Sequence, residues 1–144
     1  MNYLFLDFDG VLNNAETFKT RDDLDKIEPT KVALLNDVDA QIVISSAWRE
    51  HHSVRELKQV LARNGLHDAD RVIGQTPVLD NCPRGDEIQA WLTEHHVTPA
   101  QIAILDDIDD MEHLSPRLVL TDMADGLLPV HIQRVNELLT SSKN

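Results

Sequence analysis

The chain has 144 residues, of which 42% are hydrophobic, and this suits one domain over residues 1–144 with its own core. Its 25 acidic residues outnumber 13 basic ones, and the net charge of -12 disfavours extensive nonspecific nucleic-acid binding, which needs many basic phosphate contacts. The one cysteine, Cys82, excludes an internal disulfide, and a structural zinc site usually needs several cysteines.

The distribution of apolar and basic residues predicts neither a secretion signal nor a membrane-spanning segment. The N-terminal apolar run breaks at Asp7, and no basic region precedes that run. No stretch of about 18 apolar residues is present. We therefore expect a cytoplasmic protein that does not bind a membrane.

Apolar strands and amphipathic helices alternate along the chain, which predicts an α/β fold of the Rossmann-like, three-layer kind with a mostly parallel sheet. Strands are expected at residues 3–6, 42–44, 71–73, 102–105 and 118–120. Helices are expected at residues 29–38, 54–64, 84–94 and 129–139. The polar stretch 13–28 is expected to be a loop, either open or closing over a site as a flap. Ser53 and Glu56 form a capping box, and Gly65 suits a C-terminal cap.

Three of the expected strands end in a polar side chain, namely Asp7, Ser45 and Asp106. In open parallel sheets, sites form outside the carboxyl ends of the strands. We therefore expect these three side chains to meet at one edge of the sheet.

Asp7-Phe8-Asp9-Gly10 places two carboxylates on either side of one residue, and Gly10 permits the backbone angles of a tight turn. Such a pair can bind a hard divalent cation through oxygen. One carboxylate can attack phosphorus, while the other protonates the leaving oxygen and then activates water. The alternative is that Asp7 and Asp9 only cap a strand or turn.

Two further positions are suited to hold a phosphate group. A hydroxyl after the second strand can donate a hydrogen bond to a phosphate oxygen, and both Ser45 and Ser46 are candidates. Arg84 follows Pro83 at the start of a helix, and its planar guanidinium can neutralise a phosphate. The alternatives are a capping serine and a solvated surface arginine.

Asp106-Asp107-Ile108-Asp109-Asp110 is the densest acidic run, and its four like charges repel one another unless a cation or solvent compensates. This favours a Mg²⁺ site, although an exposed acidic loop is the alternative for Asp109 and Asp110. Neighbouring residues on a helix do not share a face. The adjacent pairs His51-His52 and His95-His96 are therefore expected to be surface residues rather than metal ligands.

Taken in order, these features resemble the haloacid dehalogenase (HAD) superfamily of phosphohydrolases. That family has a DxD motif after the first strand, Ser or Thr after the second, Lys or Arg before a later helix, and acidic residues after the fourth strand. The matching residues are Asp7-Phe8-Asp9-Gly10, Ser45, Arg84 and Asp106-Asp107, and the resemblance extends from Tyr3 to about Asp125. It implies a HAD-like fold and a Mg²⁺-dependent phosphatase that forms an aspartyl-phosphate.

The resemblance implies a role for each carboxylate. Asp7 would be the nucleophile and a Mg²⁺ ligand. Asp9 would be the general acid and base, and its backbone carbonyl would also bind the metal. Asp106 would complete the metal site with help from Asp107 or Asp110.

The resemblance also implies that Ser45 and Arg84 hold the phosphate and that Arg84 orients Asp7. The family more often has lysine where Arg84 stands. The stretch between Asp9 and Ser45 is too short for a large cap, and capless members have open sites that often serve bulky substrates.

Ser45-Ser46-Ala47-Trp48-Arg49, together with the segment around Arg84 and Trp91, resembles small capless members found in or beside RNA-repair proteins. This implies that Trp48 and Arg49 meet the base and phosphate of a substrate, since aromatic rings stack on bases. Alternatively, Trp48 and Trp91 only pack in the core or at its rim.

The expected partner is a phosphorylated substrate, and a nucleotide or RNA terminal phosphate is the favoured class. The net charge of -12 counts against this class and fits a small phosphorylated metabolite equally well. A phospho-ligand binding module without catalysis is a second hypothesis, but it has no need of a nucleophile. Carbon–halogen hydrolysis ranks last, because such enzymes usually lack an acid at the position of Asp9.

Overall fold

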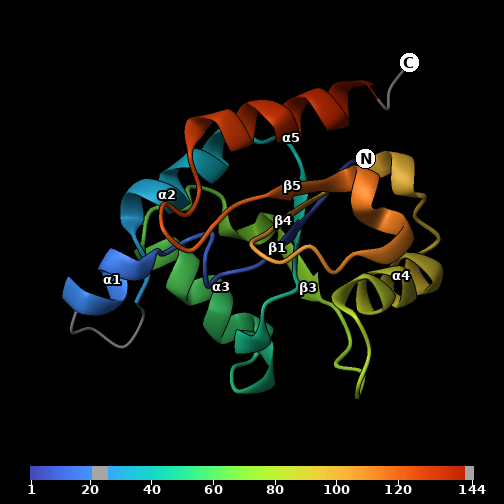
Figure 1. Cartoon of the computed structure of the whole chain (residues 1–144), viewed down its shortest axis with the longest axis horizontal. Coiled ribbons are helices and arrows are strands. Elements are labelled where there is room, and N and C mark those ends of the chain that lie inside the picture. The colour runs from blue at the N-terminus through green and yellow to red at the C-terminus, as the bar shows by residue number, and fades with distance from the viewer. Residues whose placement is uncertain (21–25, 142–144) are drawn as a thin grey trace.

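The computed structural model describes residues 1–20 and 26–141, and its centre is a five-stranded parallel sheet in the order β3-β2-β1-β4-β5 (Figure 1). The strands are β1 (Tyr3–Leu6), β2 (Gln41–Ile44), β3 (Val72–Gln75), β4 (Ile102–Asp106) and β5 (Leu118–Leu120). Every pair of neighbouring strands is parallel. The predicted α/β, Rossmann-like fold with a parallel sheet is therefore confirmed.

The helices lie between and after the strands. The α-helices are α1 (Ala15–Thr20), α2 (Pro29–Leu34), α3 (Val54–Arg63), α4 (Arg84–His95) and α5 (Pro129–Ser141). Short 3₁₀ helices are η1 (Leu35–Asp37), η2 (Ala47–Glu50), η3 (Ala69–Arg71), η4 (Pro99–Gln101) and η5 (Glu112–Arg117). Over the described residues, no helix combines the length and apolarity needed to cross a bilayer.

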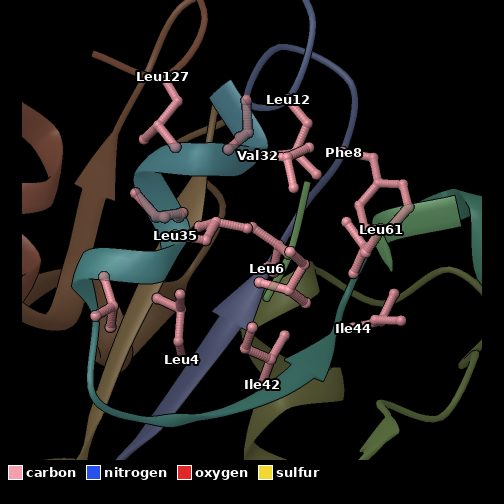
Figure 2. Close-up of a cluster of buried hydrophobic side chains, with 14 of the residues drawn as sticks. Leu4, Leu6, Phe8, Leu12, Val32, Leu35, Ile42, Ile44, Leu61 and Leu127 are labelled. Atoms are coloured by element: carbon pink, nitrogen blue, oxygen red, sulfur yellow. The ribbon is translucent and has the colours of Figure 1, made fainter. Parts of the chain in front are cut away.

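Two apolar clusters cover the two faces of the sheet, because successive side chains of a strand point to opposite faces. In one cluster, Leu4 and Leu6 of β1 pack with Ile42 and Ile44 of β2 against α2, η1 and α3 (Figure 2). The second cluster joins the intervening strand residues to side chains of α4. Its centre is an edge-to-face contact of Phe5 with Trp91 at 5.3 Å between ring centroids. The sheet thus separates α4 from α2 and α3.

The stretch 13–28 is not the continuous loop that its polarity predicts, since α1 lies within it. Asn14 Oδ1 accepts hydrogen bonds from the backbone N–H and the hydroxyl of Thr17, which is the chemistry of a helix start. The question of a flap falls partly on residues 21–25, which lie outside the described residues. By contrast, the capping box of Ser53 and Glu56 is present as predicted, and Gly65 has a φ of +115°.

Candidate active site

Strand register brings the three predicted polar residues abreast. Leu6 pairs with Ile44 of β2 and with Leu105 of β4, so the next residues along the three strands are Asp7, Ser45 and Asp106. The N–H of Ser45 donates to Leu6 O at 2.9 Å, and the N–H of Asp7 donates to Leu105 O at 3.0 Å. The three residues therefore lie at the carboxyl edge of the sheet, on neighbouring strands.

The alternation of side chains along β1 decides which face of the sheet Asp7, the residue after the strand, lies on. Phe5 belongs to the cluster under α4, so Asp7, two residues further on, lies on the same face. Phe8 belongs to the opposite cluster, which is drawn in Figure 2, and it is fully buried. This anchors the chain between Asp7 and Asp9.

Three carboxylates gather at this edge. One oxygen from each of Asp7, Asp106 and Asp107 lies within 4.8 Å of the other two. Gly10 has a φ of +80°, and a Cβ atom there would lie 2.3 Å from Asp107 Oδ2, so only glycine lets the turn approach this carboxylate so closely. Asp9 contributes no side-chain oxygen to the cluster.

Arg84 is the cation of the site. Its Nη1 lies 3.2 Å from Asp7 Oδ1 and 3.0 Å from Asp106 Oδ2. The start of α4 is itself tied to the acidic loop, because Asp110 Oδ2 accepts from the N–H of Arg84 at 3.2 Å. Asp110 therefore positions Arg84, whereas Asp107 is the residue that joins the carboxylate cluster.

Gly85 explains how closely α4 approaches that loop. Its N–H donates to Asp110 O at 2.9 Å, and a Cβ atom would lie 2.2 Å from Met111 O. Any larger residue would push the helix away and move Arg84 with it.

The electrostatics of the cluster favour a further cation. Burial raises the pKa of Asp7 to about 8, and the neighbouring Asp106 carboxylate adds to the effect. Burial also raises the pKa of Asp106, against the opposing influence of Arg84. Burial alone would lower the pKa of Arg84, but its ion pairs with Asp106 and Asp7 raise it. One arginine thus does not offset the negative charge, and oxygen ligands of this kind suit Mg²⁺.

The two serines after β2 differ in their hydrogen bonding. Ser45 is fully buried, and within the described residues its Oγ has no hydrogen-bond partner. Ser46 Oγ accepts from the N–H of Trp48 at 3.1 Å and so caps η2. An orphaned buried hydroxyl is uncommon, and its place at this edge of the sheet suits a bound ligand.

Asp9 is held by one residue four positions further along the chain and by one residue of η2. Its Oδ1 accepts from Asn13 Nδ2 at 3.0 Å and from the indole Nε1 of Trp48 at 3.1 Å. Asn13 also accepts from the N–H of Gly10 at 2.8 Å, which fixes the turn. Asn13 was not predicted from the sequence. The only indication of its role was that a polar residue stands three positions after the turn glycine, Gly10.

Arg49 has a structural task rather than the predicted contact with a substrate. Its side chain is 2% exposed, and its Nη2 lies 2.8 Å from Glu87 Oε1. Its other hydrogen bonds go to the main-chain carbonyls of Ser45, Ser46, Thr76 and Pro77. A guanidinium has five N–H groups, and all are used, so the geometry leaves none for a phosphate.

The remaining candidates are not part of the carboxylate cluster. Trp91 is a core residue, as the packing alternative predicted, whereas Cys82 and Asp109 are exposed. His95 and His96 are exposed at the end of α4. His51 and His52 are also exposed, and they line a pocket next to Asp9.

Comparison with known proteins identifies one family. The family described as the HAD domain in Swiss Army Knife RNA repair proteins matches residues 3–132, which includes every residue placed in the site above. No match was found among curated proteins.

Proposed function

The chain belongs to the family of HAD domains in Swiss Army Knife RNA repair proteins, and we propose that it is a Mg²⁺-dependent phosphatase that forms an aspartyl-phosphate on Asp7. The observation that carries the proposal is the meeting of Asp7, Asp106 and Asp107 around one arginine at the carboxyl edge of the sheet. A phosphate bound there would meet a nucleophile and a cation at once.

The residues present fit a magnesium ion. Asp7, Asp106 and Asp107 offer oxygen ligands, and the backbone carbonyl of Asp9 is the further ligand that we assign. Burial, together with the neighbouring Asp106 carboxylate, raises the pKa of Asp7. When bound, the ion neutralises charge on the transferring phosphoryl group.

The reaction divides between two carboxylates. Asp7 attacks phosphorus, so that a bond forms from its oxygen to phosphorus while the bond from phosphorus to the leaving oxygen breaks. Asp9 gives its proton to that leaving oxygen. Water then attacks the phosphorus, its proton returns to Asp9, and inorganic phosphate leaves Asp7.

Arg84 and Ser45 stabilise the transferring group. Arg84 already contacts Asp7 and Asp106 and holds Asp7 in position, and its remaining N–H groups are suited to phosphate oxygens. The buried hydroxyl of Ser45 gains a partner when a phosphate oxygen binds. Positioning and electrostatic stabilisation supply most of the catalysis in phosphoryl transfer.

The substrate class that we assign is a nucleotide or RNA terminal phosphate. The family description supports it, as does the absence of a large insertion between β1 and β2, where the described residues form only α1, α2 and η1. The net charge of -12 opposes long polyanions and favours a small substrate or a single terminal phosphate.

The test is hydrolysis of p-nitrophenyl phosphate by three proteins, each with Mg²⁺ and with EDTA. We expect metal-dependent turnover by the wild type and none by Asp7→Asn. Asp109→Asn removes a carboxylate from the same loop outside the cluster and should keep its activity. If the wild type hydrolyses neither this ester nor phosphorylated nucleotides, the proposal is overturned in favour of a phospho-ligand binding module.

A further inference from the structure

A pocket of about 350 Å³ opens beside Asp9 and is separate from the carboxylate cluster. It is lined by Asp9, Ala47, Trp48, Glu50, His51 and His52. This volume is near the lower end of the range in which proteins bind small ligands. Since Asp9 gives its proton to the leaving oxygen in the proposed reaction, the group attached to that oxygen has to lie next to Asp9.

We propose that this pocket binds the leaving group and that the leaving group is a nucleoside, so that the substrate is a nucleoside monophosphate. The assignment rests on the proposed phosphatase function, which it narrows to one kind of ester. Two features of the lining carry it, namely its aromatic rings and its charge.

The aromatic feature is the indole of Trp48, which is held before any substrate arrives. It packs edge-to-face on Phe8 at 5.1 Å between ring centroids, and its Nε1 donates to Asp9. The ring of His52 lies 6.0 Å from it. A fixed aromatic surface is suited to stack a nucleobase, and because the ring is already ordered, binding costs little conformational entropy.

The charge of the lining excludes leaving groups that carry more phosphates. Glu50 is acidic, and no lysine or arginine lines the pocket among the described residues. Arg49, which is close in sequence, is buried with all its N–H groups in use. A nucleoside diphosphate or a longer oligonucleotide would place its next phosphate in a pocket with the Glu50 carboxylate and no lysine or arginine, whereas a single nucleoside would not.

The first experiment compares kcat/KM for adenosine monophosphate, as the 3′ and the 5′ ester, with kcat/KM for glycerol 2-phosphate. For the adenosine ester that is hydrolysed faster, we expect the kcat/KM of the wild type to exceed that for glycerol 2-phosphate by about tenfold or more, which is the usual effect of stacking one base. Trp48→Ala should lose this preference, and Trp48→Phe should retain most of it. Both variants lose the hydrogen bond to Asp9, so their difference isolates the aromatic ring.

The second experiment measures binding without turnover. The chain has 2 tryptophans, so in a Trp91→Phe background the fluorescence reports on Trp48 alone. Adenosine should quench this fluorescence, and glycerol should not. Quenching by adenosine in a protein without phosphatase activity would support the pocket and overturn only the proposed function.

Three results would overturn the inference about the pocket. One is a wild-type enzyme with no preference for adenosine esters over glycerol 2-phosphate. Another is a preference that Trp48→Ala leaves intact, together with no quenching by adenosine. The third is a trinucleotide with a terminal phosphate that is hydrolysed with a higher kcat/KM than the mononucleotide, since this would require a basic track next to the pocket.

Discussion

Ser45 and Ser46 are adjacent, yet their hydroxyl groups serve different partners. Ser46 Oγ completes the start of η2, whereas Ser45 Oγ is buried without a hydrogen bond in the described structure. A buried hydroxyl without a partner destabilises the protein that carries it. The hydroxyl of Ser45 therefore makes no hydrogen bond that stabilises the fold within the described residues, and a phosphate oxygen is the partner that its place beside Asp7 suggests.

This contrast predicts opposite effects of two neighbouring substitutions. Ser45→Ala should leave the free energy of unfolding unchanged or slightly higher and should weaken the binding of inorganic phosphate about tenfold. Ser46→Ala should keep the affinity for phosphate and lose about 1 kcal/mol of stability with its cap. Urea denaturation and calorimetric titration measure both quantities. If Ser45→Ala binds inorganic phosphate as tightly as the wild type, the Ser45 hydroxyl does not contact the phosphate.

The raised pKa of Asp7 predicts how stability and metal affinity change with pH. The pKa is 3.8 for a free aspartate and about 8 in the metal-free fold, so between these values the folded state binds a proton that the unfolded state has lost. The stability of the metal-free protein should therefore fall as the pH rises through this range. Because Mg²⁺ binds the ionised carboxylate, its affinity should rise with pH and its binding should release a proton near neutral pH.

Calorimetric titration of Mg²⁺ in two buffers with different ionisation enthalpies measures this proton release. Asp109→Asn should release protons as the wild type does, and Asp7→Asn should release fewer. Equal proton release by Asp7→Asn and the wild type would show that another group carries the proton.

At the scale of elements, the sequence was most informative where local rules decide the structure. The capping box at Ser53 and Glu56 and the apolar alternation of β1 and β2 were predicted from residues close in sequence, and both are present. Helix α1 was not predicted, because its mostly polar residues show no apolar periodicity. The residue that marks its start is Asn14, three residues before Thr17. Short helices without an apolar stripe are decided by such caps rather than by periodicity.

Elements that are distant in sequence are joined by the pair of Arg49 and Glu87. Arg49 binds carbonyls after β2 and after β3, and Glu87, one turn into α4, also accepts from the N–H of Leu79 at 2.8 Å. The pair therefore connects the segment that contains Ser45 to the helix that begins with Arg84. Its partners are 38 residues apart by their numbers, and no local pattern in the sequence reports such a contact.

Breaking this buried pair should be costly. Arg49→Ala leaves the carboxylate of Glu87 buried without its cation, and we expect a loss of about 3–5 kcal/mol in the free energy of unfolding. Glu87→Gln keeps the size and hydrogen-bonding capacity of the side chain and should lose less, so it serves where Arg49→Ala does not fold. Arg55→Ala, at an exposed position of α3, is the matched control and should change stability by about 0.5 kcal/mol or less. A loss of under about 1 kcal/mol for Arg49→Ala would contradict this account.

At the scale of the whole molecule, the parallel sheet explains which site residues a sequence can reveal. The meeting of Asp7, Ser45 and Asp106 could be predicted because the carboxyl ends of parallel strands share one edge. The contact of Trp48 with Asp9 could not be predicted, because it spans 39 residues and depends on how η2 packs on the turn after β1. The same limit applies to Arg49, for which the resemblance implied a phosphate contact, whereas its side chain is buried and its N–H groups bind carbonyls and Glu87.

The net charge of -12 makes a prediction about substrates that belongs to the molecule rather than to any residue. A phosphorylated oligonucleotide is repelled at long range, and salt screens that repulsion, with a Debye length of about 10 Å at 0.1 M. The kcat/KM for an oligonucleotide with a terminal phosphate should therefore rise with ionic strength, and the rise should be smaller for a nucleoside monophosphate. Initial rates at constant Mg²⁺, between about 0.01 M and 0.1 M salt, measure both. Proteins that hold nucleic acids through basic residues behave in the opposite way, so a rate that falls with salt for the oligonucleotide alone would reveal a basic track for RNA.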